Sequence, residues 1–221
     1  WNEDEIFRYT PNTNIALKIV SSNANDTSAG NGARQIKVSG LQHSGVGGDS
    51  VYTAISETAT MNGTTLVNLS SEFYRVLKVE VVQAGATSLN QGNIKVVDGS
   101  GNCFGTIEAG DNVSNMLIVS PETGQDILCE ALHVSAHFQT PTELKINIFD
   151  ETLGLQKTIY KFFLSSNSDH FTFKIRKKIS AGQTLWASLN PLVAVTGSHN
   201  QISAMLEATK ASTNVSIPAI V

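Results

Sequence analysis

The sequence predicts an all-β fold, an antiparallel β-sandwich of jelly-roll type. Apolar residues alternate with polar ones in many short runs, which recur at about 8–12-residue spacing with Gly, Asn, Asp or Ser turns between them. Only 15% of the residues are charged while 41% are hydrophobic, so Ser, Thr, Asn and Gln supply most of the polarity. An Asn-Gly pair between two β-prone runs adds a strong hairpin signal.

The chain's 221 residues allow one large β domain or two small ones. We expect an N-terminal arm at residues 1–11, a first sandwich at 12–110 and a second at 111–221, with the two sandwiches stacked. Each of the larger parts offers roughly seven strand-like runs, the number found in a small sandwich. The segment Glu108 to Val113 reads as the link between them.

The arm begins with an acidic run at residues 3–5 and carries three aromatic side chains, Trp1, Phe7 and Tyr9. We expect it to pack against the chain's own sheet. The alternative is that residues 1–9 pack on another subunit.

Alternating apolar residues place the strands of the first half. Ile15, Leu17 and Ile19 alternate with Ala16 and Lys18 in the first of them. The expected strands are residues 15–19, 34–38, 51–60, 64–69, 73–83, 92–97 and 103–107. Asn62-Gly63 predicts a hairpin between 51–60 and 64–69, because a type I′ turn requires positive φ at both central residues.

The run 73–83 is the longest strand expected in the first half. Its Lys78 and Glu80 are two residues apart, so we expect both on the solvent face of the pleat.

The second half repeats the pattern with longer strands, expected at 116–119, 127–138, 143–149, 155–164, 171–176, 184–189 and 201–208. Leu144, Ile146 and Ile148 give a clean alternation. Residues 202–210 favour a helix by composition. Because Pro218 follows closely, we expect a strand there instead.

Charge and composition exclude several classes of protein. A formal net charge of −4 argues against a nucleic-acid binder, which usually has a basic footprint. No apolar run approaches the roughly 18 residues of a membrane span, and no secretory signal pattern is visible. Cys103 and Cys129 allow at most one bridge, and two buried thiols are the expected alternative.

No motif predicts a catalytic, cofactor or metal site. The glycines near residues 30–32 precede a strand, whereas a dinucleotide loop opens a helix. The glycines at 45–48 lack the Lys-Ser/Thr ending of a phosphate loop. No Gly-x-Ser-x-Gly elbow occurs. The following carboxylates are scattered along the chain: Glu57, Glu72, Asp98, Glu108 and Asp111.

The histidines do not predict a zinc site. His133 and His137 share one face of an expected strand, which separates them by about 13 Å, too far to bind one ion. His43, His170 and His199 fall in loops without cysteine partners.

Lys174, Arg176, Lys177 and Lys178 form the one basic cluster in the sequence. We expect it to lie in solvent near a strand end. An acidic partner surface, including a neighbouring subunit's residues 3–5, is the alternative.

Three blocks occur in a fixed order: SSNANDTSAGNGARQIKVSGL, ISETATMNGTT and FYRVLKVEVVQAG. On residues 26–34, 55–65 and 73–79 they resemble a family of structural proteins of tailed phages, many of them from aquatic bacteria. The likeness extends loosely through DHFTFKIRKKI, within 165–179, to residues 204–207. The loop 43–50, Ala59 and Met61 depart from the family pattern. Trp1-Asn2 resembles a motif that lies inside related chains, so we expect residues upstream of it.

The resemblance implies a virion component of the head-decoration, minor capsid, neck or tail-associated type. We therefore expect a non-enzymatic protein that contacts copies of itself, with a trimer as first expectation, and other virion proteins. A receptor- or glycan-binding module of a fibre or lectin is the alternative. That alternative predicts an exposed aromatic platform, with Trp186 and Tyr52 as candidates, although we expect Trp186 in the core.

Overall fold

The computed structural model describes residues 13–45, 49–114, 116–137, 142–164, 169–191 and 201–212. The expectations for the arm at residues 1–11 and for His199 lie outside these residues. The chain divides into two compact units, one ending at Met116 and the other beginning at Leu117. Within the described ranges the units contain strands and turns but no α-helix, and no helix could therefore cross a membrane.

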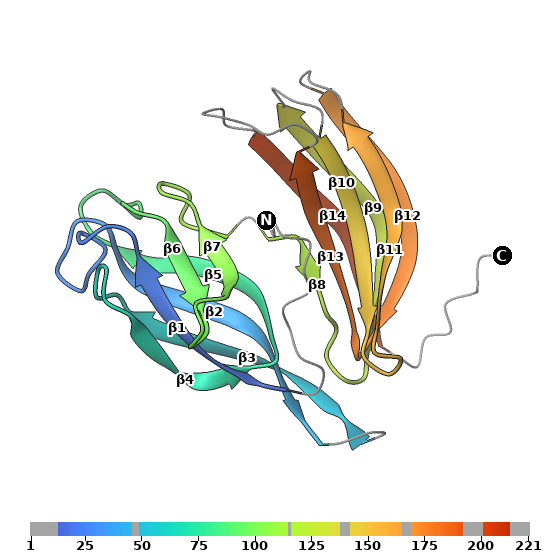
Figure 1. Cartoon of the computed structure of the whole chain (residues 1–221), viewed down its shortest axis with the longest axis horizontal. Helices are drawn as coiled ribbons and strands as arrows, with labels where there is room; N and C mark the ends of the chain where they lie inside the picture. Colours follow the sequence, from blue (N-terminus) through green and yellow to red (C-terminus); the bar gives the residue numbers. More distant parts are fainter. Residues whose placement is uncertain are drawn as a thin grey trace. The chain divides into compact units, whose positions relative to one another are not determined.

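The first unit is a sandwich of two antiparallel sheets (Figure 1). One sheet has the order β4-β1-β6-β7 and the other the order β3-β2-β5. The strand bounds are β1 Ile15–Ser21, β2 Ala33–Ser44, β3 Val51–Thr60, β4 Val67–Phe73, β5 Arg75–Ala84, β6 Ile94–Val97 and β7 Cys103–Ile107.

Apolar side chains from both sheets fill the space between them. The alternation predicted for the first strand is confirmed, because Leu17 and Ile19 are both buried in this core. Ile36 and Val38 of β2 face them from the other sheet and are fully buried. Together with residues of β4 to β7 they form one continuous cluster, as two packed sheets require.

The hairpin predicted at Asn62-Gly63 is wrong. Gly63 does have a positive φ of 60°, but β3 and β4 belong to different sheets. The turn is held instead by the segment after β1, because the N–H of Gly63 donates to the carbonyl of Asp26 and that of Ser28 to the carbonyl of Met61. After this turn the chain passes from the sheet of β3 to the other sheet, where β4 pairs with β1.

The strand predicted at 73–83 is broken at Tyr74. Phe73 ends β4 in one sheet and Arg75 begins β5 in the other. The N–H of Tyr74 donates to the carbonyl of Leu41 at 2.7 Å, which fixes the crossing point. Lys78 and Glu80 form an ion pair on the strand, as expected for residues of one face.

The second unit also has two antiparallel sheets, ordered β11-β10-β13-β8 and β12-β9-β14. The strand bounds are β8 Ile118–Val119, β9 Gln125–His137, β10 Thr142–Asp150, β11 Leu155–Leu164, β12 Asp169–Ser180, β13 Gln183–Pro191 and β14 Gln201–Ser212. Residues 202–210 are therefore a strand, as expected.

Contacts between β11 and β12 join the two sheets of the second unit. The rings of Phe162 and Phe173 stack at 3.8 Å between centroids, and the hydroxyl of Tyr160 donates to the carbonyl of Ile175 at 2.7 Å. Leu144 and Ile146 of β10 are fully buried, as predicted. The clean alternation expected for this strand does not hold, because Asn147 and Phe149 on its other face are buried as well.

The all-β prediction is confirmed, and each unit has seven named strands in two sheets. The jelly-roll form of the sandwich stays a prediction. The segment predicted as a link packs with the first unit, since Val113 bridges to Glu80 and the N–H of Ser114 donates to the carbonyl of Val79. The unit boundary therefore follows residue 116 rather than residue 110.

Candidate functional site

The motif block at 26–34 is organised by one buried carboxylate. Asp26 is 0% exposed, and its Oδ1 accepts hydrogen bonds from the backbone N–H groups of Ala33 at 2.7 Å and Gln91 at 2.9 Å. Its Oδ2 accepts from the hydroxyl of Ser21 at 2.6 Å and the N–H of Gly92 at 2.9 Å. Four donors from three parts of the chain therefore meet at one side chain.

The glycines of the block make room for this carboxylate. A Cβ at Gly32 would lie 2.1 Å from Oδ1 of Asp26, and a Cβ at Gly30 would lie 2.0 Å from the carbonyl oxygen of Asn25. The guanidinium Nε of Arg34 donates to the carbonyl of Gly30 at 2.9 Å. The block is therefore a tightly closed turn before β2, as predicted, and the carboxylate of Asp26 is bonded within the first unit.

A buried amide continues the network on the neighbouring loops. Asn90 is 1% exposed, and its Nδ2 donates to the carbonyls of Gly92 and Glu108 at 2.8 Å and 2.7 Å. Its Oδ1 accepts from the N–H groups of Gly110 and Asn112. The loops at 22–32, 85–93 and 108–113 are thus fixed to one another by the side chains of Asp26 and Asn90.

An aromatic and arginine cluster lies where β2, β3 and the β4–β5 crossing meet. Arg75 is 0% exposed, and its guanidinium carbon lies 3.6 Å from the centroid of the Tyr74 ring. It donates to the carbonyl and the hydroxyl of Tyr74 at 2.7 Å and 2.9 Å. The rings of His43, Tyr52 and Tyr74 lie 5.1–5.5 Å apart between centroids.

Sequence reasoning assigned no role to Arg75, although it lies in the third motif block. The sequence feature that could have indicated its role is a charged residue next to an aromatic one, at the start of a valine-rich strand. His43 was expected in a loop, but its N–H and carbonyl bond the side chain of Asn14 within β2. Burial, and secondly the positive charge of Arg75, lower the pKa of His43.

The two candidates for an exposed aromatic platform are both buried. Trp186 is 4% exposed, as expected for a core residue, and Tyr52 is 7% exposed. The expectation that Tyr52 presents an aromatic surface is therefore wrong, because its ring packs in the cluster with His43 and Tyr74.

The predicted acidic residues are not brought together. Glu57 of β3 accepts the N–H groups of Ser70 and Ser71 at 2.8 Å and 2.7 Å. Burial alone would raise the pKa of Glu57, but these hydrogen bonds outweigh it and lower the pKa. Asp98 binds the N–H groups of Ser100 and Asn102 within its own turn. Burial raises its pKa, but these bonds, chiefly to Asn102, lower it overall.

The histidines likewise do not converge. His133 lies 3.1 Å from the hydroxyl of Thr172 and 3.4 Å from the carboxylate of Glu207. His170 was expected in a loop but belongs to β12, and the side chains of His137 and His170 lie outside the described part. Among the residues with described positions, no three His, Cys, Asp or Glu side chains gather as a metal ion would need.

Both cysteines are free thiols. Cys129 is fully buried, as expected, and burial raises its pKa to about 11. Cys103 is only half-buried, with its sulfur 3.3 Å from the hydroxyl of Thr106.

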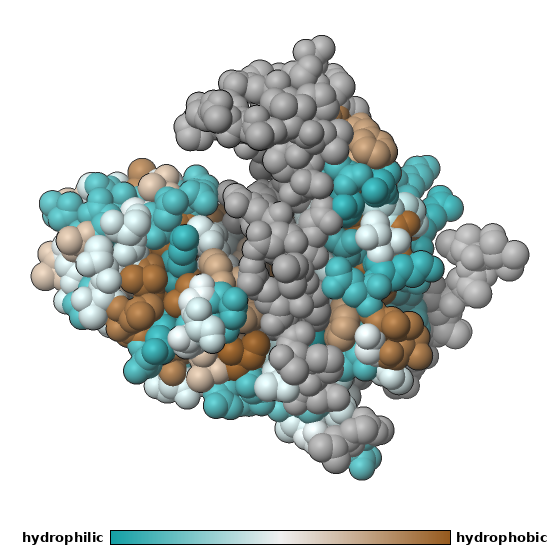
Figure 2. All heavy atoms as spheres, viewed as in Figure 1, coloured by the Kyte–Doolittle hydropathy of each residue, from teal (hydrophilic) through white to brown (hydrophobic). Residues whose placement is uncertain are grey.

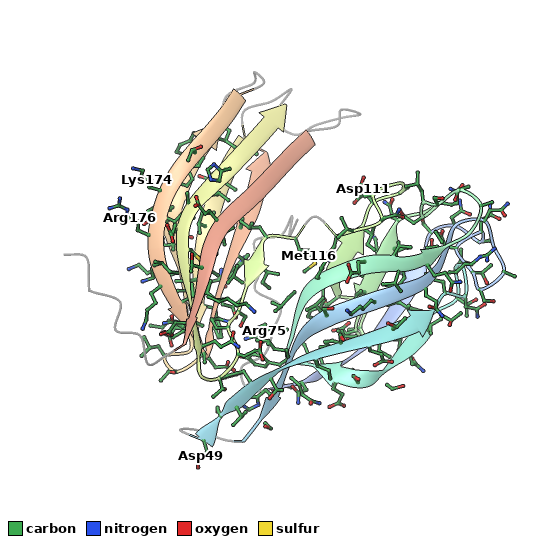
Figure 3. All side chains as sticks on the ribbon, turned by 180° about the vertical axis from the view of Figure 1, so that it is seen from behind. Asp49, Arg75, Asp111, Met116, Lys174 and Arg176 are labelled. Atoms are coloured by element: carbon green, nitrogen blue, oxygen red, sulfur yellow. The ribbon has the colours of Figure 1, made fainter. Side chains whose placement is uncertain are left out.

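The basic cluster lies on β12, which borders its sheet. Figure 3 shows the side chains of Lys174 and Arg176 projecting away from the strand. Lys178 pairs with Asp126 at 2.9 Å. Arg176 has a positive φ of 46° and lies in a bulge between Lys174 and Lys177. The cluster is exposed, as expected, but runs along the strand rather than at its end.

No family model, no curated protein and no solved structure matches this chain.

Proposed function

We propose that this chain is a non-enzymatic structural component of a tailed-phage particle, of the capsid decoration, minor capsid, neck or tail-associated type. Its work is mechanical. It self-assembles into a homo-oligomer and docks on other virion proteins. Burial of apolar side chains at interface centres, surrounded by hydroxyl and amide hydrogen bonds, supplies the binding energy.

The proposal is supported by the positions of two motif residues, which are buried and bonded within the first unit. Asp26 and Arg75 are charged residues from two of the three blocks, and each is 0% exposed. Each is bonded to backbone groups or a neighbouring ring rather than held toward solvent. The resemblance therefore rests on residues that build a rigid scaffold, as a structural component needs.

The exposed surface is compatible with docking. Figure 2 shows hydrophobic residues scattered among hydrophilic ones on the visible face. Among the residues whose side chains are described, the large exposed apolar ones are Val51, Leu66, Val82, Leu89, Val113, Leu153, Leu155 and Phe163. The receptor-binding alternative loses its two aromatic candidates, since Tyr52 and Trp186 are buried.

The proposal is tested by mass spectrometry of phage particles. The particles are purified from a host infected with the phage whose genome encodes this chain. We expect the chain in stoichiometric amounts in the particles, and a cryo-EM map of them with paired β-sandwiches at its position. A chain that is abundant in the lysate but absent from purified particles contradicts the proposal.

A further inference from the structure

The borders of the four sheets differ in whether another strand can pair with them. A border strand exposes unpaired N–H and C=O groups, and proteins usually block it with charges, bulges, short length or a covering segment. The inference drawn here rests on the proposed assembly function and names the strand through which copies meet.

Three long borders are blocked in the described part of the chain. On β5, the segment 112–114 bonds the backbone of Val79 and Val81. On β11, a bulge interrupts the ladder next to Ile146. On β12, the bulge at Arg176 and the neighbouring lysines disrupt the edge.

The β4 border is blocked by a side chain from β3. Residues 69–71 of β4 bulge opposite Leu17, since the register passes from Glu72–Ala16 to Asn68–Lys18. The bulge leaves the N–H groups of Ser70 and Ser71 outside the ladder, and the carboxylate of Glu57 accepts both. The borders β7 and β8 are short, at five and two residues.

In the described ranges, the border β3 shows none of these devices over Thr53–Ser56. Its ten pairs with β2 run without a register shift, and no other described strand pairs with it. The four residues are uncharged, and Thr53, Ala54 and Ser56 are exposed. The β2–β3 hairpin ends near Asp49, at the tip seen in Figure 3, so this border reaches the end of the sheet. The last long border, β14, carries the exposed charges Glu207 and Lys210.

We propose that β3 of one copy pairs antiparallel with β3 of a second copy across a two-fold axis near residues 54–55. The occupant is a second copy because the strand is its own complement. In a two-fold pair each residue meets its own kind or a near neighbour, so like charges would face each other. Thr53–Ser56 brings none, whereas pairing β12 with itself would oppose Lys174, Arg176 and Lys177. The product is a dimer, in place of the trimer expected from the sequence.

The test is sedimentation equilibrium of the full chain and of two variants with the same added charge. The variant A54E/S56E places carboxylates opposite each other in the paired strands. The control A24E/A29E places them on exposed positions of the 22–32 loop. We expect the unchanged chain and the control to be dimers. The dissociation constant of the A54E/S56E dimer should be at least about tenfold higher than theirs. Circular dichroism checks that both variants keep their strands.

A second measurement locates the contact. A spin label on S56C, in a C103S background, should give a single label-to-label distance below about 20 Å, since paired strands lie about 4.8 Å apart. A monomer at millimolar concentration, a trimer, or a dimer that survives in A54E/S56E overturns the proposal. Particle incorporation is measured separately, so failure of the β3 contact leaves the proposed function standing.

Discussion

The carboxylate of Asp26 accepts a hydrogen bond of 2.9 Å from the backbone N–H of Gly92, 66 residues later in the chain. This bond ties the turn before β2 to the loop before β6. The same oxygen accepts the hydroxyl of Ser21, and the other oxygen binds Ala33 and Gln91. Asp26 therefore joins three separate segments at the loop end of the first unit.

Asp26→Asn should lower the free energy of unfolding of the first unit by about 3–5 kcal/mol. The amide NH2 cannot accept hydrogen bonds, so two buried donors lose their acceptor, each at a cost of about 1–3 kcal/mol. Urea unfolding of the full chain measures the loss, and amide hydrogen exchange assigns it to the first unit. Asp49→Asn, at an exposed residue, should stay within about 0.5 kcal/mol. Equal stability of the two variants contradicts this account.

Gly32→Ala should cost about 2–3 kcal/mol because the added Cβ would lie 2.1 Å from Oδ1 of Asp26 and 2.8 Å from Cγ of Gln91. Gly99→Ala is the matched control, since a Cβ there meets no atom within 4 Å. Thermal unfolding compares the two. If Gly99→Ala lost more stability than Gly32→Ala, the close contact between a Cβ at residue 32 and Asp26 would not explain the cost.

Glu57→Gln should destabilise the chain at pH 7 by about 1 kcal/mol, because a charged acceptor binds the N–H groups of Ser70 and Ser71 better than a neutral one. The pKa of Glu57 is lowered in the fold, so its contribution is complete above the usual carboxyl pKa. It is lost as the pH falls through the lowered value. Urea unfolding at pH 7 and at pH 3 should therefore show a difference that shrinks in acid. A stability difference between the two chains that is larger at pH 3 than at pH 7 would contradict a lowered pKa for Glu57.

Arg75→Lys should cost about 2–3 kcal/mol. Lysine keeps the charge but cannot direct two hydrogen bonds to the carbonyl and hydroxyl of Tyr74 while stacking on its ring. Tyr74→Phe removes only the hydroxyl and should cost about 1 kcal/mol. The exchange Lys78→Arg, at a side chain that is half exposed, is the control and should be nearly neutral. Denaturant titration of all three variants orders the effects.

Thiol titration should distinguish the two cysteines. With its pKa raised to about 11 by burial, Cys129 holds almost no thiolate at pH 8, so the native chain should react at Cys103 alone. Both thiols should react in denaturant. Cys103→Ser should abolish the native reaction, and rapid labelling of two thiols without denaturant would contradict the buried position of Cys129.

Local pattern was sufficient to place most strands. Alternation at Leu144, Ile146 and Ile148 and at Leu17 and Ile19 predicted segments that the structure forms, because the two-residue period of a strand is a property of the chain itself. It also separated the Gly30–Gly32 turn from a dinucleotide loop, since a strand and not a helix follows.

The sequence pattern did not predict which strands pair with one another. Asn62-Gly63 has the backbone of a tight turn, yet the strands on either side join different sheets, because Asp26 and Ser28, from the segment after β1, supply hydrogen-bond partners for Gly63 and Met61. The bend at Tyr74 likewise depends on the carbonyl of Leu41.

The sequence by itself determined that this chain is made of β-strands, with alternating faces and no recognisable catalytic motif. Only the tertiary structure decided which strands pair, that Asp26 and Arg75 are buried, and that Glu57 binds the bulge of β4. The reason is physical. Strand formation depends on neighbours in sequence, whereas these features depend on hydrogen bonds between residues brought together from distant parts of the chain.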